Sequence, residues 1–217
     1  MDRIEFPTAI AAYFLIALVL PTLRVWRKHR IWPLVFHREE NPIARAMGLL
    51  FGAFLIALMV WAILYWRLDP PAIGIWGAPD WVAGLGWLFI ACGTVITVVA
   101  QGQMGTAWRI GIDDRPTELV ANGLFALSRN PIFSGMIFTL MGAVLIAPAV
   151  WSILFASVTI VLIAVQTRFE EKHLVELHGE KYIAYAQQVG RFAPGVGRFP
   201  KNGVGMPEAA IHSERGE

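Results

Sequence analysis

The chain has 217 residues, of which 56% are apolar and only 16% are charged, and it contains nine tryptophans. A soluble globular domain has about 45–50% apolar and about 25% charged residues, so this chain carries more apolar surface than a soluble domain of its size could bury. Its single cysteine, Cys92, excludes a disulfide framework, a cysteine-rich zinc site and an iron–sulfur cluster. The net charge of +2 is too small and too scattered for a nucleic-acid-binding protein. We therefore expect a membrane protein with no nucleic-acid partner and no metal.

Uncharged stretches predict the membrane-spanning helices, since a helix needs about 20 residues to cross about 30 Å of hydrocarbon. The first three stretches provide one span each, which we place at residues 6–23, 46–66 and 81–101. The fourth stretch, 132–167, is too long for one crossing, and Pro148 lies near its middle. Proline interrupts a helix because it lacks the N–H and clashes with the preceding turn. We therefore expect an all-α integral membrane protein with five transmembrane helices, in which spans 132–147 and 149–167 form a tight hairpin.

Basic residues alternate between the loops and predict the orientation, because cytoplasmic loops carry an excess of Lys and Arg. The segments 24–45 and 109–131 and the tail after residue 167 carry several Lys or Arg each. The connection between the second and third spans contains only Arg67, and the hairpin tip contains none. This pattern predicts an extracytoplasmic N-terminus and a cytoplasmic C-terminus. The first apolar run lacks a basic n-region and a cleavage site, so we expect no cleavable signal peptide.

The segments on the cytoplasmic side predict a loop and a helical cap. Residues 109–131 mix charges with glycines and a proline, which is typical of a structured loop. Residues 168–189 have apolar side chains at helical spacing, with a first short helix ending at Gly179 and a second beginning at Glu180. Residues 200–217 are expected to be a disordered tail. The basic aromatic segment 24–45 suits the headgroup layer, with a lid over an acceptor entrance as the alternative.

Arginine and carboxylate side chains are predicted to meet at the mouth of the hairpin. Arg129 precedes the fourth span, and Arg168, Glu170 and Glu171 follow the fifth. Two interpretations stay open from the residues alone: a functional cluster, or interface anchors with a solvated helix start. The span interiors contain no Asp, Glu, Lys, Arg or His, which argues against a pump or a proton-coupled transporter. All five histidines lie outside the spans, which argues against a bis-histidine haem.

Five short sequence pieces in this region form a collinear pattern. They are MGTAWR at 104–109, LV at 119–120 with NGLF at 122–125, RNPIFSG at 129–135, EEKHL at 170–174 with HG at 178–179 and YIAY at 182–185, and VGRF at 189–192 with PG at 194–195. In their order and spacing, these pieces resemble the bacterial branch of the isoprenylcysteine carboxyl methyltransferase family. That family lies within a wider group that includes the phospholipid N-methyltransferases. The resemblance covers residues 104–198, under half of the chain.

The resemblance implies an integral membrane methyltransferase that uses S-adenosylmethionine, with its core at 104–198. In such relatives a cytoplasmic pocket holds the cofactor, between the loop before the fourth span and the helix after the fifth. Glu170 and Glu171 would hold the cationic end of the cofactor, and Tyr182 and Tyr185 would close the lid. The full set of implied cofactor-binding residues is Leu119, Val120, Gly123, Arg129, Asn130, Pro131, Phe133, Gly135, Glu170, Glu171, Tyr182 and Tyr185.

The sequence departs from the family pattern where an acceptor would bind. Relatives usually have histidine at Asn130 and tyrosine at Phe133, and often arginine at Gln166. Arg168 is the candidate replacement for that arginine, on a different helical face, and Gln166 becomes a candidate substrate contact. Trp108 and Arg109 lie at the same depth, and Arg109 could orient an anionic acceptor, with a snorkelling anchor as the equal alternative. The candidate catalytic residues are Arg168 and Arg109, and the candidate substrate residues are Trp108, Arg109 and Gln166.

The expected activity is methyl transfer in a membrane, with bilayer lipids around the protein. The acceptor is a lipophilic small molecule or an isoprenylcysteine-like thiol-acid, methylated on O, S or N. Phospholipid N-methylation is the alternative enzyme activity, and a redox-accessory or scaffold protein that retains the fold is the non-enzymatic alternative. The resemblance implies a bacterial inner membrane.

The loop charges generate a test of orientation. A reporter that is active only outside the cytoplasm is expected to stay inactive when fused after Glu217 and to become active when fused before Met1. Activity of the C-terminal fusion would contradict the predicted orientation.

Overall fold

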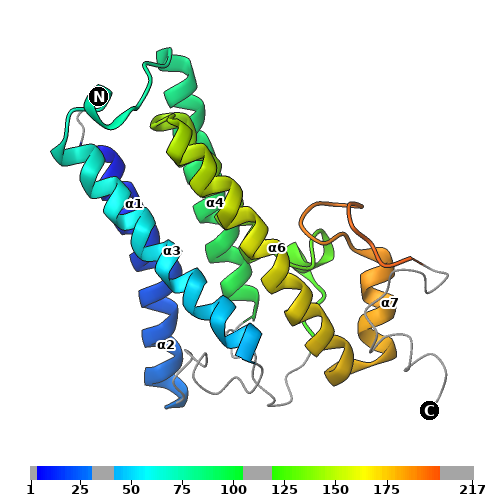
Figure 1. Cartoon of the computed structure of the whole chain (residues 1–217). Coiled ribbons are helices and arrows are strands. Elements are labelled where there is room, and N and C mark those ends of the chain that lie inside the picture. The colour runs from blue at the N-terminus through cyan, green and yellow to red at the C-terminus, as the bar shows by residue number, and fades with distance from the viewer. Residues whose placement is uncertain (1–3, 31–41, 105–118, 201–217) are drawn as a thin grey trace.

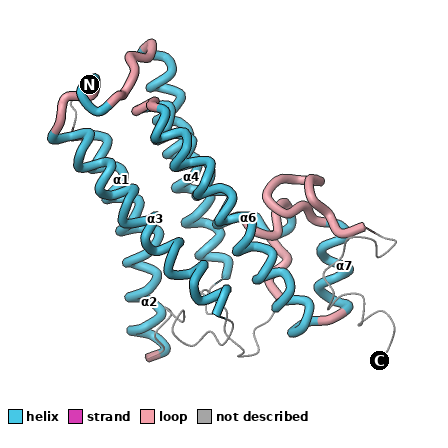
Figure 2. Tube along the Cα trace, in the orientation of Figure 1, coloured by secondary structure: helices cyan, strands magenta, loops and turns pink. Residues whose placement is uncertain are grey.

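The computed structural model describes residues 4–30, 42–104 and 119–200, and within these ranges it contains only helices, turns and loops (Figures 1 and 2). Outside the described residues lie Trp108, Arg109, residues 31–41 of the basic aromatic segment and the predicted tail from residue 201 onward. The helices, in chain order, are α1 (Glu5–Phe14), a π-helical stretch (Leu15–Val19), α2 (Leu20–His29), α3 (Pro42–Arg67), a short turn (Pro71–Ile73), α4 (Asp80–Met104), a short turn (Gly123–Ala126), α5 (Pro131–Ile146), α6 (Val150–His178) and α7 (Glu180–Gln188).

The five long helical segments pack around one apolar core (Figure 1). Trp61 of α3 lies at its centre, where its ring makes edge-on contacts with Phe6 of α1 and Trp151 of α6. At the same end of the bundle, the connection after α3 is fastened to α6, because the Trp151 indole Nε1 donates to the carbonyl of Ile73 at 2.7 Å. Buried core residues come from each long segment: Phe6, Ile10, Leu58, Trp61, Ala62, Ile90, Leu140, Ala143 and Ala156.

Pro21 lies inside the first long helix, which continues past it to His29. Because proline has no N–H, the carbonyl of Ala17, four residues earlier, loses its usual intrahelical partner. The Gln101 amide of α4 replaces that partner, since its Nε2 donates to the Ala17 oxygen at 2.6 Å. The π-helical stretch ends at Val19, two residues before the proline. A buried side chain from another helix therefore satisfies the backbone group that the proline leaves free.

Glycines bring the backbones of α4 and α5 into direct contact. A methyl group added at Gly142 would lie 2.5 Å from the Gly86 carbonyl oxygen, and one added at Gly93 would lie 2.5 Å from the Gly135 carbonyl oxygen. The pairs Gly86–Gly142 and Gly93–Gly135 run in opposite chain directions, so the two helices are antiparallel. Small residues at such contacts are the usual way in which membrane helices pack closely. This crossing places the start of α5 beside the end of α4.

Among the described residues, three helical segments are long and apolar enough to cross a membrane, and two further apolar stretches, Gly52–Arg67 within α3 and Pro131–Ile146, are shorter. The long ones are Glu5–Arg27, Asp80–Met104 and Val150–His178. Large apolar side chains such as Leu88, Val95 and Val161 point outward from them, as expected of lipid-facing surfaces. The all-α membrane fold class is supported, and the number of five spans stays a prediction. α5 ends and α6 begins on either side of Pro148.

α6 is longer than the span predicted over 149–167. It contains 29 residues and runs without interruption to His178, so the short separate helix expected after residue 168 is wrong. The physical reason is that no glycine or proline occurs between Val150 and His178. At about 1.5 Å per residue the helix is about 44 Å long, which exceeds about 30 Å of hydrocarbon. Its last turns, after Thr167, therefore extend beyond the apolar layer. The predicted helix end at Gly179 and start at Glu180 are confirmed.

The α4–α5 contact generates a stability prediction. Gly93→Ala places a methyl group against the Gly135 carbonyl oxygen and the Thr139 side chain, and overpacking of this kind costs typically about 1–3 kcal/mol. The thermal midpoint in detergent is therefore expected to fall. Gly102→Ala, on the same helix, is the matched control because its added methyl group meets no atom within 4 Å. Equal midpoints for the two variants would contradict the close crossing.

Candidate functional site

Four segments meet beyond the apolar layer, at one end of the bundle. They are the loop before α5, the last turns of α6, helix α7 and the segment 189–199 (Figure 1). Backbone hydrogen bonds join the segment 189–199 to two of the others. The Arg129 N–H of the loop before α5 donates to the Gly190 carbonyl at 2.8 Å, and the Phe199 N–H donates to the Ala186 carbonyl of α7 at 2.9 Å. Most of the residues predicted to form a site lie on these segments.

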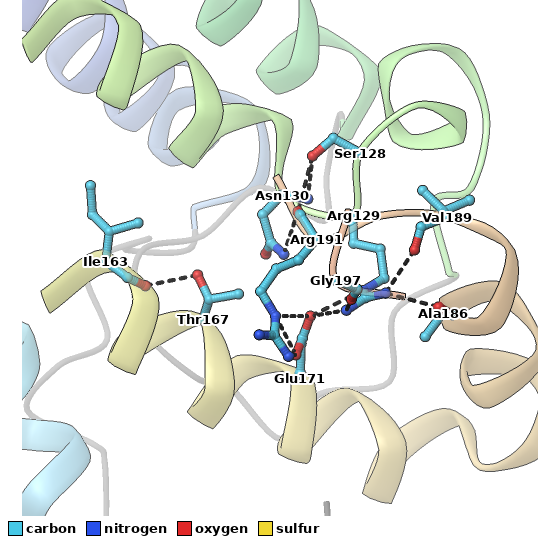
Figure 3. Close-up of polar contacts among 10 residues, drawn as sticks. All are labelled: Ser128, Arg129, Asn130, Ile163, Thr167, Glu171, Ala186, Val189, Arg191 and Gly197. Atoms are coloured by element: carbon cyan, nitrogen blue, oxygen red, sulfur yellow. Dashed lines mark hydrogen bonds and ion pairs between the residues drawn. The ribbon is translucent and has the colours of Figure 1, made fainter. Parts of the chain in front are cut away.

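Arg129 is the central cation of this region, and its side chain has no exposed surface. Its Nε and Nη2 donate to Glu171 Oε1 at 3.0 and 2.6 Å. Nη1 donates to the carbonyls of Ala186 and Val189 at 2.9 and 2.7 Å, and Nη2 also donates to the carbonyl of Gly197 at 3.0 Å (Figure 3). A guanidinium has five N–H donors. These five hydrogen bonds therefore use its full donor capacity inside the protein.

Glu171 carries the opposing charge and is only 1% exposed. Arg191 approaches its other oxygen, with Nη2 at 2.7 Å and Nε at 3.0 Å from Oε2 (Figure 3). The predicted meeting of Arg129 with Glu171 is thus observed, but both carboxylate oxygens are already occupied by guanidinium groups. Sequence reasoning missed Arg191, although it lies in the VGRF piece at 189–192. The role of Arg129 and Glu171 toward a cofactor stays a prediction.

Asn130 and two serines hold the segment 189–199 against the head of α5. The Asn130 Nδ2 donates to the Arg191 carbonyl at 3.2 Å, and the Ser128 hydroxyl donates to the same carbonyl at 3.1 Å. The Ser134 hydroxyl donates to the Phe192 carbonyl at 2.7 Å. Arg191 is therefore bound through its backbone as well as its guanidinium. This double attachment fixes where its charge lies relative to Glu171.

The two tyrosines of α7 have different surroundings. Tyr182 is 1% exposed and packs in an apolar cluster with Val175 and Phe199. The Tyr185 hydroxyl donates to the Phe125 carbonyl at 2.6 Å, which ties α7 to the loop before α5. Burial raises the pKa of Tyr185 to about 12, and burial together with the nearby Glu171 charge raises the pKa of Tyr182. Both phenols therefore remain neutral at physiological pH.

Gln166 and Glu170 form a second polar pair on α6, at the end of the apolar layer. The Gln166 Nε2 donates to Glu170 Oε1 at 3.3 Å. Gln166 is 9% exposed, and its Oε1 has no hydrogen-bond partner among the described residues. Burial raises the pKa of Glu170 to about 7, with the Glu171 charge adding to the shift. This pair, unlike the cluster of Arg129, Glu171 and Arg191, retains unused acceptor capacity.

The remaining predicted residues are placed as follows. Gly123 has a φ of +59° and leaves no room for a side chain, because the Gln103 side chain occupies that space. Gly135 faces α4 at the helix crossing, close to Gly93 and Thr97. Arg168 is exposed on α6. Leu119, Val120 and Phe133 are half-buried, and Pro131 is buried in the first turn of α5. Over the described ranges, no group of three His, Cys, Asp or Glu side chains could hold a metal ion.

Comparison with known proteins finds a family match over the part of the chain that carries most of these residues. A family described as phospholipid methyltransferase matches residues 81–181, which run from α4 to the start of α7. Over this region the chain is similar to membrane methyltransferases. This confirms the resemblance to the bacterial branch of the isoprenylcysteine carboxyl methyltransferases that the sequence pieces indicated.

Two curated relatives and one solved structure define the likeness. A methanethiol S-methyltransferase of Crocosphaera subtropica is 28% identical over 171 residues, which cover 73% of this chain and 64% of that protein. A protein-S-isoprenylcysteine O-methyltransferase of Arabidopsis thaliana is 28% identical over 120 residues, or 54% of this chain and 61% of that protein. The structure of a eukaryotic intramembrane Ras methyltransferase matches with a TM-score of 0.57 and 18% identity, over 92% of this chain and 70% of the other. This match shows a shared membrane fold. The chain spans less than two thirds of the length of these curated relatives.

The buried ion cluster generates a stability prediction. Glu171→Gln keeps the size of the side chain and removes the charge that Arg129 and Arg191 share. Removing one partner of a buried ion pair costs about 3–5 kcal/mol, so we expect a lower thermal midpoint and faster proteolysis within 189–199. Glu176→Gln, at an exposed position of the same helix, is the control. A variant at Glu171 as stable as this control would show that the cluster does not hold the four segments together.

Proposed function

We propose that this chain is a membrane methyltransferase that uses S-adenosylmethionine and acts on a lipophilic small molecule, with a thiol as the favoured acceptor. The observation that carries the proposal is that the family match over 81–181 includes Arg129 and Glu171, which form the buried ion pair at the end of α6. The methanethiol enzymes among its relatives favour sulfur as the methylated atom. An isoprenylcysteine-like thiol-acid is the second acceptor of the same chemical class, by similarity to the plant relative.

The end of α6 offers hydrogen-bond acceptors that suit a cofactor with positively charged groups. S-Adenosylmethionine carries two positively charged groups and supplies the methyl group. Among the described residues none donates to the buried Gln166 Oε1, and Glu170 has a partly buried carboxylate beside it, so α6 offers acceptors to a cationic ligand. We assign the cationic end of the cofactor to this end of α6, with the buried Gln166 Oε1 as its acceptor beside Glu170 and Glu171, and to Arg129, Glu171 and Arg191 the task of holding the surrounding segments. The other proposed contacts are Leu119, Val120, Gly123, Asn130, Pro131, Phe133, Gly135, Tyr182 and Tyr185.

In the proposed orientation, the site lies where the cytoplasm meets the bilayer. We propose five spans, an extracytoplasmic N-terminus and a cytoplasmic C-terminus in a bacterial inner membrane, as the loop charges predict. The end of α6 that carries Glu170 and Glu171 would then face the cytoplasm. A water-soluble cofactor would arrive from that side, while an apolar acceptor would arrive from the bilayer. Arg168, Trp108 and Arg109 remain proposed acceptor contacts.

Phospholipid N-methylation is the second candidate function, because the matching family is described as phospholipid methyltransferase. The two activities differ in the nucleophile, since an amine headgroup is methylated on nitrogen and a thiol on sulfur. A scaffold that retains the fold would bind no cofactor at all. These outcomes are separable by experiment.

The proposed function predicts saturable binding of S-adenosylmethionine to the detergent-purified chain, measured by isothermal titration calorimetry. Radioactive methyl groups from the same compound are expected to appear in a volatile or organic-soluble thioether when small alkane thiols are supplied. Label confined to phospholipid would favour N-methylation. Absence of both binding and transfer by the folded protein would contradict the enzyme assignment.

A further inference from the structure

We infer that Glu170 takes the proton of a thiol acceptor during methyl transfer and that Gln166 positions its carboxylate. This inference rests on the proposed function and goes beyond it by naming the residue that accepts the proton of the thiol. The two side chains are four residues apart on α6, where such residues lie on one face. Their hydrogen bond, from Gln166 Nε2 to Glu170 Oε1, measures 3.3 Å.

The position of the pair points to a ligand. Ile163, one turn before Gln166, is 1% exposed, so this face of α6 is turned toward the protein interior. Gln166 has a buried Oε1 to which no described residue donates. A buried acceptor without a donor costs free energy, and its persistence is explained when a ligand group donates to it. A thiol S–H or the ammonium group of the cofactor is such a donor.

The charges around Glu170 suit a proton acceptor. Glu171 is its neighbour on α6, but Arg129 and Arg191 already bind the Glu171 carboxylate. Tyr182 of α7 also feels the Glu170 charge, and its own pKa is raised mainly by burial. Among the residues described, no cation is paired with Glu170. Burial holds its pKa at about 7, and a general base works best when its pKa is near the working pH.

The reaction balances without any further reactant. The thiol S–H bond breaks, and its proton goes to a Glu170 carboxylate oxygen. The thiol sulfur forms a bond to the methyl carbon, while the bond between that carbon and the donor sulfur breaks and leaves its electron pair on the donor. One negative and one positive charge disappear together, so the partly buried site is electrically neutral before and after transfer. Glu170 then releases the proton to water.

The first test compares two thiols by their pH profiles of kcat/KM. With an alkane thiol, the wild-type value is expected to rise with pH and to level off at or below about pH 7. Glu170→Gln should be slower by at least about 100-fold at pH 7, and its rate should keep rising at higher pH as the thiol ionises by itself. With an aromatic thiol that is already ionised at neutral pH, the same variant should lose at most about threefold, because no proton has to be removed.

The second test does not depend on turnover. Infrared spectroscopy of the cofactor-free protein should show a protonated carboxyl band that titrates near pH 7 and is absent in Glu170→Gln. Gln166→Leu removes the hydrogen-bond donor of the carboxylate, so it should move both this titration and the pH profile upward. Gln166→Leu also tests the inference if Glu170→Gln fails to fold. Glu176→Gln, exposed on the same helix, is the control and should behave as the wild type.

The outcomes separate this inference from the proposed function. Equal losses of Glu170→Gln with both thiols, together with a loss of cofactor affinity, would make Glu170 a cofactor ligand only and would overturn the inference. A wild-type pH profile in Glu170→Gln, or no carboxyl titrating near pH 7, would also overturn it. A folded wild-type chain that neither binds S-adenosylmethionine nor methylates a thiol would overturn the proposed function and this inference with it.

Discussion

The buried contact of Glu171 with two arginines is the interaction on which this end of the molecule depends. Arg129 comes from the loop before α5, Glu171 from α6 and Arg191 from the segment after α7. A charge removed from water is tolerated only when its partners satisfy it, and the five hydrogen bonds of Arg129 meet that requirement. The same bonds reach the carbonyls of Ala186, Val189 and Gly197. One guanidinium therefore determines the relative placement of α5, α6, α7 and the segment that follows.

The close crossing of α4 and α5 delivers this arginine to its position. Gly93 and Gly135 allow backbone contact between the two helices, and Arg129 lies just before the first turn of α5. A larger side chain at either glycine would move the head of α5 away from α4. Because Arg129 has many short contacts, a shift of this kind would break several of them together. Packing inside the membrane and ion pairing outside it are thus mechanically linked.

The two adjacent glutamates differ in their partners, which suits them to different tasks. Both oxygens of Glu171 are bound by arginines, which suits a group that holds structure. Glu170 is bound only by the Gln166 amide among the described residues, and its pKa lies near 7. A carboxyl with spare acceptor capacity and a pKa in that range suits a group that exchanges protons or meets a cation. The pair of acidic residues is therefore divided into a structural member and a chemically available one.

The sequence by itself determined the membrane class, the helix end at Gly179 and the meeting of Arg129 with Glu171. These features depend on local properties: the length of an uncharged stretch, the conformational freedom of glycine and the missing N–H of proline. A local rule also failed, since α6 continues through the expected boundary near residue 168. The helix around Pro21 needs more than local properties, because the donor that replaces the missing N–H is Gln101, eighty-four residues away in the chain.

Only the tertiary structure decided which of the polar residues are already satisfied. The neighbouring glutamates of the EEKHL piece are equivalent as a pattern, and nothing local distinguishes Glu170 from Glu171. The difference arises because Arg191, which follows α7, folds back onto one of them and not the other. The number of partners of a buried side chain depends on contacts between segments that are distant in sequence. For that reason the sequence located the cluster, and only the fold decided which of its members are already paired.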